Sequence, residues 1–458
     1  MKKTAKFLLL TVLAFSFLIS MIACTKTNKQ SETSETRMTI ELVTAGSDDA
    51  LLTEDDLPEG EGKYYTVTGY TFSESDAQIV TYAADDKYYY TDYYTGTRGK
   101  DKDYLTEKER YNELTALTLP KAVKVATSDA KIYLTAERLA KVDANGVIDL
   151  SNGSANAKTL YIRTIDANAF LNHTELKAVV VPETYLAIGD GAFSGCGNRE
   201  EMTIPFVGKK TGAVNGGKNF GYIFGTYEYT NSVSAAQNYN LSGSATYYVP
   251  ADLRKVTVTA DVTPYAFYNV TTVEEVVYNY GDVIPAYAFY GCTGLKSLEL
   301  PASVKEIGEG AYGSCNKLNK VNFTALTALE KIGANAFAGC TMLGYTDGKV
   351  LNLPASVKFI GEQAFANCTS IEKFVFEATE QAEIKAQAFS GLTSLEEVTI
   401  KNALMSIGAF DTWSEMLTAT LTDCTVVGGG DLKLAFIGAI TAEDAEGKEW
   451  LDVNFKLN

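Results

Sequence analysis

Hydrophobic and polar positions follow a short block that returns along most of the chain. The stretch LELPASVKEIGEGAYGSC at residues 298–315 comes back as LNLPASVKFIGEQAFANC at residues 351–368. Ahead of the proline, apolar residues alternate with polar ones, as in a strand with one buried face. Proline then ends the strand because it can donate no ladder hydrogen bond. Each block therefore predicts a short strand.

The second half of the block predicts the connection from this strand to the next one. Val304 and Ile307 bring the chain across the core as a second flat side. Gly308 then turns the chain, and we expect a positive φ there, which only glycine adopts without cost. The residues around Tyr312 follow on one face of a helical turn.

An aromatic residue after an alanine or glycine turn marks each copy of the block. These landmarks are Phe170, Phe193, Phe267, Phe289, Tyr312, Phe337, Phe365, Phe389 and Phe410. They lie 21 to 28 residues apart, except for a gap of 74 after Phe193, which we interpret as about three units with an insertion over 206–248. Such units stack, because one alone buries too little to fold. About 12 coils at ~4.8 Å would form a rod of roughly 58 Å.

The predicted fold is thus a repeat solenoid with a strand and a short helical or 3-10 turn in each coil, preceded by a small β-rich region. Residues 1–23 are typical of an export signal, since lysines precede an apolar run too short to span a membrane. We expect an acidic disordered tether over 24–62, a tyrosine-rich β cap over 63–113, the solenoid over 114–410 and a C-terminal cap over 411–458.

Composition and charge narrow the functional classes. The 458 residues carry a net charge of −17, which disfavours nucleic acids and anionic lipid surfaces as partners. His173 is the single histidine, and this removes most metal and Ser/His schemes, so we expect neither a cofactor nor an enzyme. It fills a position that cysteine takes in other coils, which favours a packed, hydrogen-bonded role.

Five cysteines each follow an aromatic landmark by three residues. They are Cys196, Cys292, Cys315, Cys340 and Cys368. Because the repeat places them toward the core, we predict a structural ladder of buried free thiols rather than disulfides.

The outward face of the strands is the first candidate binding surface. Its residues are Val180, Glu275, Val277, Glu299, Lys320, Asn322, Asn352, Lys373 and Val375. This mixed surface can bind a protein by area and shape, but offers no convergent acid, base or nucleophile. The second candidate is the insertion, with Tyr222, Tyr227 and Tyr229, which either binds a partner or covers the rod as a lid.

The pattern L-x-x-L-x-L-P-x-S-V-x-x-I-G-x-x-A-F-x-G-C resembles the BspA-like leucine-rich repeat of surface proteins from host-associated bacteria. It is carried by residues 295–315, 318–340, 351–368 and 371–390. The resemblance implies binding to host matrix or plasma proteins, other bacteria or epithelial cells. Met21-Ile22-Ala23-Cys24 similarly resembles a bacterial lipobox, which implies a lipid on Cys24 and attachment to the outer membrane or cell surface by that lipid alone.

The sequence thus favours an adhesin-like surface protein with protein ligands. An envelope scaffold or assembly protein is one alternative. A hydrolase with a carboxylate pair is a less favoured one, since the pairs Glu274-Glu275 and Glu396-Glu397 would point to opposite faces of a strand.

Overall fold

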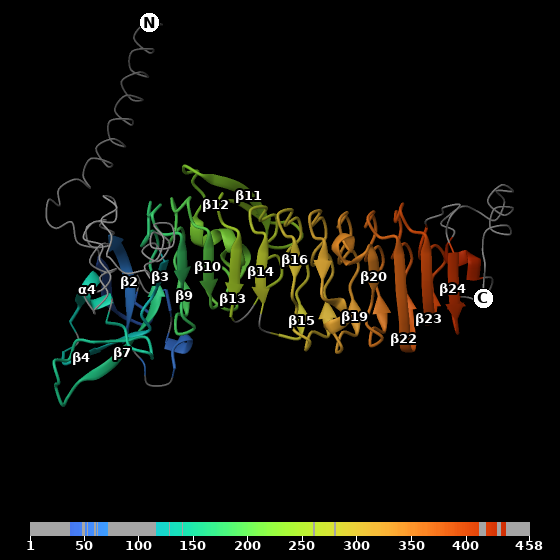
Figure 1. Ribbon diagram of the computed structural model, residues 1–458. Helices are drawn as coiled ribbons and strands as arrows, with labels where there is room; N and C mark the ends of the chain where they lie inside the picture. The colour runs from blue at the N-terminus through green and yellow to red at the C-terminus, as the bar shows by residue number, and fades with distance from the viewer. Residues whose placement is uncertain are drawn as a thin grey trace, which may run out of the picture.

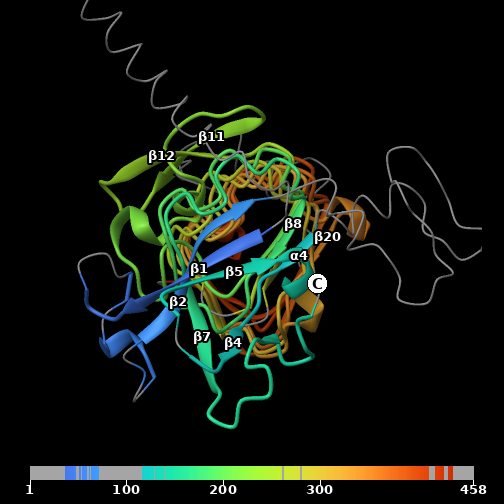
Figure 2. The same ribbon diagram turned by 90° about the vertical axis from the view of Figure 1, so that its left-hand side faces the viewer.

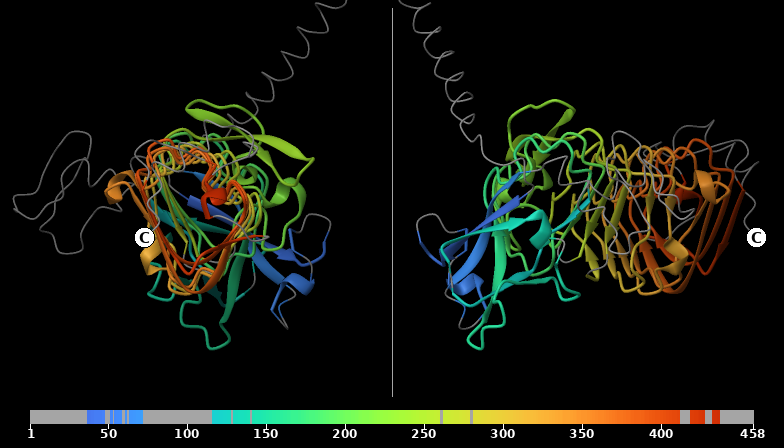
Figure 3. Two further views of the ribbon diagram at one scale, coloured as in Figure 1. Left: turned by 90° about the vertical axis from the view of Figure 1, so that its right-hand side faces the viewer. Right: turned by 60° about the vertical axis from the view of Figure 1, so that its left-hand side comes forward.

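The computed structural model describes residues 37–71, 116–411, 418–427 and 432–436, apart from 48–50, 53, 59–60, 62, 128, 140, 260–261 and 279–280. It is a rod that makes about 13 turns in this part of the chain, with a β-rich region at the N-terminal end (Figure 1). Seen from either end, the coils superimpose around a common axis (Figures 2 and 3). The expected signal, Cys24 and the tyrosine-rich stretch after residue 71 lie outside the described residues.

The N-terminal region is one sheet packed on the first coils. Its strands, in spatial order, are β5 (Lys131–Thr135), β1 (Arg37–Thr44), β2 (Lys63–Thr71), β7 (Lys158–Ile165), β4 (Ala122–Val125) and β6 (Val147–Asp149), with β9 (Ala187–Ile188) also paired to β7. The short helices η1 (Glu54–Asp56) and α4 (Ala136–Leu139) lie in its connections. Strand β7 leads into the solenoid because β9, in the next coil, pairs with it in parallel.

Strand β1 shows that the predicted disordered tether over 24–62 is wrong where the structure describes that segment. Residues 37–44 form an antiparallel pair with β2 on one side and with β5 on the other. Met38 and Ile40 are fully buried, in the alternation expected of a strand with one covered face. The acidic run that follows hid this alternation. The predicted cap over 63–113 contributes β2 to the same sheet.

Two parallel ladders of strands build the sides of the solenoid. The first comprises β3 (Ala116–Thr118), β8 (Ala178–Val180), β10 (Glu201–Ile204), β13 (Lys255–Val258), β14 (Glu275–Tyr278), β16 (Ser297–Leu298) and β18 (Lys320–Val321). The second comprises β15 (Val283–Ile284), β17 (Glu306–Ile307), β19 (Lys331–Ile332), β21 (Phe359–Ile360), β22 (Lys373–Ile384), β23 (Glu397–Met405) and β24 (Thr418–Thr422), with β20 (Val350–Asn352) on β22 and β25 (Thr425–Val426) on β23. Strand β17 is the predicted second flat side.

The aromatic landmarks form one continuous stack in the core from Phe267 onward. Successive ring centroids from Phe267 to Phe410 lie 5.2, 5.1, 5.4, 5.3, 5.5 and 4.8 Å apart, and their planes are nearly parallel. This confirms that the landmarks mark successive turns of a single coil. Most turns between the ladders are hydrogen-bonded turns, and 3-10 helices form only in some coils, such as η4 (Phe323–Ala325) and η5 (Tyr345–Asp347).

The stack does not end at Phe410, as the fading sequence pattern suggested. Phe436 lies 4.5 Å from Phe410, directly after η6 (Leu432–Ala435). Strands β24 and β25 also extend the ladder beyond residue 410. Ala435-Phe436 is therefore one more copy of the alanine and aromatic landmark, so repeats continue into the segment 411–458 expected to be only a cap.

The gap between Phe193 and Phe267 contains fewer coils than the expected three units. Among the described strands, β10 alone lies between β8 and β13. Residues of η3 (Phe220–Phe224) supply the aromatic landmark of this one coil, because the ring centroid of Phe220 lies 4.7 Å from that of Phe267 and Phe193 N donates to Ile223 O. The true insertion is the hairpin of β11 (Ser232–Asn238) and β12 (Ser244–Pro250), preceded by η2 (Asn215–Lys218), rather than all of 206–248. The hairpin lies along the upper edge of the rod in Figure 1.

Gly308 is required for a different reason from the one expected. Its φ is not among the positive values, whereas Gly310, two residues later, has φ 57°. Gly308 N donates to Ile284 O of the preceding coil, and a Cβ at Gly308 would lie 2.7 Å from Ala286 N. Glycine thus permits two backbones to approach, and the predicted positive φ is wrong.

Candidate binding site

Most of the predicted outward positions lie in parallel register on the first ladder. Glu275 is paired with Lys255 on one side and Ser297 on the other, and Ser297 is paired with Lys320. Val180 and Val277 belong to the neighbouring row, and Lys373 and Val375 lie on β22 in the second ladder. The structure therefore places the predicted strand residues along the outside of the rod.

Charges on this face are paired between coils. Lys255 Nζ lies 3.2 Å from Glu275 Oε1, and Lys373 Nζ lies 2.7 Å from Glu397 Oε2. Each partner is more than a third exposed, so such a pair contributes only about 0.2–1 kcal/mol. Alternation of sign prevents any one charge from dominating the face.

A groove interrupts this face between β18 and β20. We call it the strand-face groove; its volume is about 420 Å³. It is lined by Glu299, Lys320, Val321, Asn322, Phe323, Thr324, Leu343, Gly344, Asp347, Val350, Leu351 and Asn352. Four of the predicted strand-face residues thus come together here, namely Glu299, Lys320, Asn322 and Asn352.

The groove forms because the ladder of strands breaks. Strand β18 pairs with β16, β20 pairs with β22, and the described ladders contain no pairing between β18 and β20. The short helices η4 and η5 fill the connections around the break, and Phe323 is anchored against Phe337 at 5.3 Å. A strand edge without a neighbour presents backbone groups that can pair with another chain.

Side chains of the strand-face groove have different roles. Asn322 Nδ2 donates to Leu300 O, and Asn322 Oδ1 accepts from Leu300 N, so this amide holds the coils together. Lys320 Nζ lies 3.7 Å from Glu299 Oε1, and these side chains are 48% and 70% exposed. Asn352 is also exposed. Lys320, Glu299 and Asn352 are therefore accessible polar groups of this groove, as are Thr324 and Asp347.

The three tyrosines predicted in the insertion do not converge on one site. Tyr222 is half-buried, Tyr229 Oη donates to Tyr248 O, and Tyr227 is 82% exposed. The hairpin itself packs against the rod, because Asn219 Nδ2 donates to both Asn238 O and Tyr265 O.

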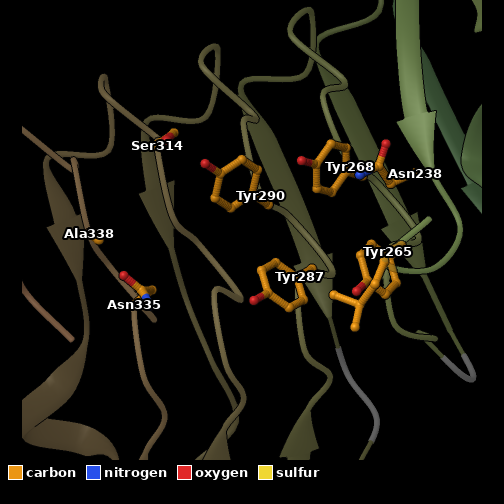
Figure 4. A pocket seen from close by; sticks show the side chains of 9 residues that line it. Asn238, Tyr265, Tyr268, Tyr287, Tyr290, Ser314, Asn335 and Ala338 are labelled. Carbon is orange, nitrogen blue, oxygen red and sulfur yellow. The ribbon is translucent and has the colours of Figure 1, made fainter. Parts of the chain in front are cut away.

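A second groove, which the sequence pattern does not predict, lies beside the hairpin on the turn side of the coils. We call it the tyrosine groove; its volume is about 320 Å³. Its lining residues are Asn238, Leu241, Tyr265, Tyr268, Tyr287, Tyr290, Ser314, Asn335 and Ala338 (Figure 4). The rings of Tyr265 and Tyr287 lie 5.1 Å apart with planes 13° from parallel, and those of Tyr268 and Tyr290 lie 5.0 Å apart at 16°. Burial raises the pKa of Tyr268 further above its ordinary value of 10.0, at which the phenol is already protonated at neutral pH.

Two of these tyrosines occupy a strained backbone position. Tyr265 and Tyr287 have φ of 66° and 56°, which for a bulky residue is an outlier. The same position, two residues before the landmark, is left-handed in other coils too, where it holds Asn168, Gly191, Gly310, Asn335, Gln363, Gln387 and Gly408. The left-handed conformation costs about 1–2 kcal/mol for a residue with a Cβ, and a ring pair contributes about 0.5–1.5 kcal/mol. Most other coils have asparagine or glycine here, so the fold does not require tyrosine at this position.

The residue types at equivalent positions of the coils are the sequence signal that indicates this groove. Tyrosine also follows the landmark in the same two coils, at Tyr268 and Tyr290. Other coils have mostly smaller residues at that position, namely Leu171, Ser194, Gly313, Ala338, Ala366 and Ser390. Four tyrosines thus gather where the repeat requires none.

The five ladder cysteines lie inside the rod, and His173 is partly buried. All five ladder cysteines are buried and free, and each Sγ donates to the backbone oxygen of an aromatic landmark in an earlier coil, as Cys315 Sγ does to Phe289 O at 3.2 Å. His173 Nε2 lies 2.7 Å from Tyr70 O, and Nδ1 faces Glu175. Within the described residues, no group of three His, Cys, Asp or Glu side chains could hold a metal ion. The same part of the chain has no helix long and apolar enough to cross a membrane.

Solved structures of low sequence identity are similar to this chain. A leucine-rich repeat protein from Bacteroides ovatus ATCC 8483 is 15% identical, with 84% of this chain and 76% of that chain covered and a TM-score of 0.32. A leucine rich cell surface protein from Faecalibacterium prausnitzii A2-165 is 14% identical, with 68% of each chain covered and a TM-score of 0.28. The pneumococcal vaccine antigen PcpA is 15% identical, with 68% and 71% covered and a TM-score of 0.24. No curated protein matches the chain.

The family of the repeat follows from the sequence matches. The BspA type leucine rich repeat region, in six copies, matches residues 158–274, 260–347 and 327–423, which together exceed half of the chain. These residues form the parallel coils with the aromatic stack inside. The chain therefore belongs to the BspA type leucine rich repeat family.

Proposed function

We propose that this chain is a lipid-anchored protein of the cell surface that binds proteins of a host or of other bacteria through its strand-face groove. The observation that carries the proposal is the break between β18 and β20, where exposed Lys320, Glu299 and Asn352 surround a hollow in an otherwise regular face.

The geometry of the groove suits a protein ligand. Its volume of about 420 Å³ lies within the range of about 300–1,000 Å³ typical of pockets for small molecules, so the groove has room for a side chain. A side chain of a partner can enter the hollow while its backbone pairs with the open strand edges. The regular face on both sides provides further contact area.

The anchor is supported by the first residues of the chain. Lysines, an apolar run and Met21-Ile22-Ala23-Cys24 suit export and lipidation of Cys24. A lipid with more than one acyl chain holds a protein stably at a membrane. From such an anchor, a rod can present its groove away from the membrane.

Surface display is tested by treating intact cells with protease and following the chain. We expect degradation on intact cells, and release of a Cys24→Ala variant from the membrane fraction. A chain that resists protease until the envelope is opened would contradict surface display, and would favour the scaffold alternative.

A further inference from the structure

The tyrosine groove has the construction of a ligand site distinct from the strand-face groove. It lies on the turn side of the coils, against the hairpin tip that carries Leu241. We propose that the tyrosine groove binds a neutral carbohydrate, with a pyranose ring stacked on the rings of Tyr287 and Tyr290.

The ring geometry leaves aromatic faces open. Near-parallel rings in contact are about 3.5 Å apart, so a centroid distance of 5.0–5.1 Å requires an offset of about 3.6 Å. The rings thus overlap like roof tiles, and each leaves part of a face uncovered. Figure 4 shows Tyr287 and Tyr290 face-on, with hydroxyls directed toward Asn335 and Ser314.

Two glycines of the next coil make room for this arrangement. A Cβ at Gly310 would lie 2.5 Å from the Tyr287 ring, and one at Gly313 would lie 2.8 Å from the Tyr290 ring. The ladder of tyrosines therefore ends at this coil, where the groove opens toward Asn335 and Ser314.

Polar side chains at the rim of the tyrosine groove can form hydrogen bonds with the hydroxyl groups of a sugar. Asn238, Ser314 and Asn335 carry donors and acceptors, as sugar hydroxyls do. The C–H face of a pyranose ring is apolar and lies well on an aromatic face. Tyr287 Oη already donates to Glu309 Oε1, which fixes the ring in place.

A neutral carbohydrate fits better than the other ligands of aromatic surfaces. The net charge of −17, together with exposed Glu309 at the rim, disfavours an acidic polysaccharide. Proline-rich peptides dock in aromatic-lined grooves, where a proline ring can enter between two aromatic rings. A ring inserted between two parallel tyrosines needs about 7 Å, and the centroids of neighbouring tyrosines here are 5.0–6.0 Å apart.

The test measures binding of the full chain to gluco-, galacto-, manno- and xylo-configured neutral hexasaccharides, and to deca-proline, by isothermal titration calorimetry. We expect at least one hexasaccharide to bind, and a Tyr287→Asn/Tyr290→Ala variant to bind it at least tenfold more weakly. These replacements are the residues that the coil of Asn335 and Ala338 has at the same two positions. Because Tyr287→Asn relieves the left-handed strain, the melting temperature should not fall.

Two further variants keep the test independent of folding and of the strand-face groove. Ala338→Trp should fill the tyrosine groove from its opposite wall and also abolish binding, whereas Tyr227→Ala, outside it, should leave binding unchanged. The proposal is overturned if no hexasaccharide binds at 10 mM, if deca-proline binds instead, or if both groove variants bind like the parent chain. Substitutions in the strand-face groove should not affect this binding, so the two proposals fail separately.

Discussion

At the residue scale, the Ile-Gly pair found in four of the coils is explained by backbone contact. Gly189, Gly308, Gly333 and Gly361 each donate a backbone hydrogen bond to an isoleucine oxygen of an earlier coil. A Cβ at any of these glycines would lie 2.3 to 2.7 Å from a backbone nitrogen of that coil. The recurrence of glycine in the sequence predicts that this residue is needed here. The sequence alone cannot distinguish a positive φ from a close approach of two backbone segments.

A substitution at Gly308 separates these two causes. Gly308→Ala should destabilise the protein by about 1 kcal/mol or more, because neither backbone can move away without breaking the hydrogen bond to Ile284. Gly69→Ala is the matched control, since nothing lies within 4 Å of a Cβ there and φ is not positive. The urea midpoint of each variant measures the effect. Equal midpoints for both variants would show that the coils can separate.

At the element scale, the coils repeat the same strand and core contacts, and these contacts appear in the sequence as a period of 21 to 28 residues. The strand, the proline and the aromatic landmark could be predicted because they recur in nearly the same letters. The sequence pattern does not reveal the coils of Phe220 and Phe436, since Phe220 lacks the preceding alanine and Phe436 follows a glycine-rich segment. Strand β1 was missed because its partners, β2 and β5, are distant in sequence.

The buried cysteines make the stability of the folded protein depend on pH. Burial raises the pKa of Cys292, Cys340 and Cys368 well above the ordinary value of 9.0. Below about pH 9 these thiols are neutral in both the folded and unfolded chain, so they do not change stability with pH. Above it, the unfolded chain loses protons that the folded chain retains, and stability should fall as pH rises.

Replacing one thiol measures how much that thiol contributes to the fall in stability with rising pH. Cys340→Val puts an apolar side chain where other coils have Val270 or Leu392. Between pH 9 and 10.5, the free energy of unfolding should fall less steeply in this variant, by up to about 1.4 kcal/mol per pH unit. Urea unfolding at several pH values measures the slope. A slope identical to that of the parent chain would mean that Cys340 already ionises in the folded protein.

At the scale of the whole molecule, both grooves arise where the repeat departs from its own rule. The strand-face groove lies where β18 and β20 are not paired, and the tyrosine groove contains residues that strain the backbone of two coils. The sequence placed Glu299, Lys320 and Asn352 on one face through the strand register. It could not show the break itself, because η4 and η5 depend on contacts such as Phe323 with Phe337 between coils.

Binding of Asn352→Arg to immobilised matrix proteins and to cells, compared with the parent chain, tests the central claim most directly. The arginine should fill the strand-face groove and reduce binding at least tenfold. Thr420→Arg places the same side chain in the register row of Asn352, on β24 and outside the groove, and should bind like the parent. Equal binding by all three proteins would contradict the assignment of the groove as the protein-binding site.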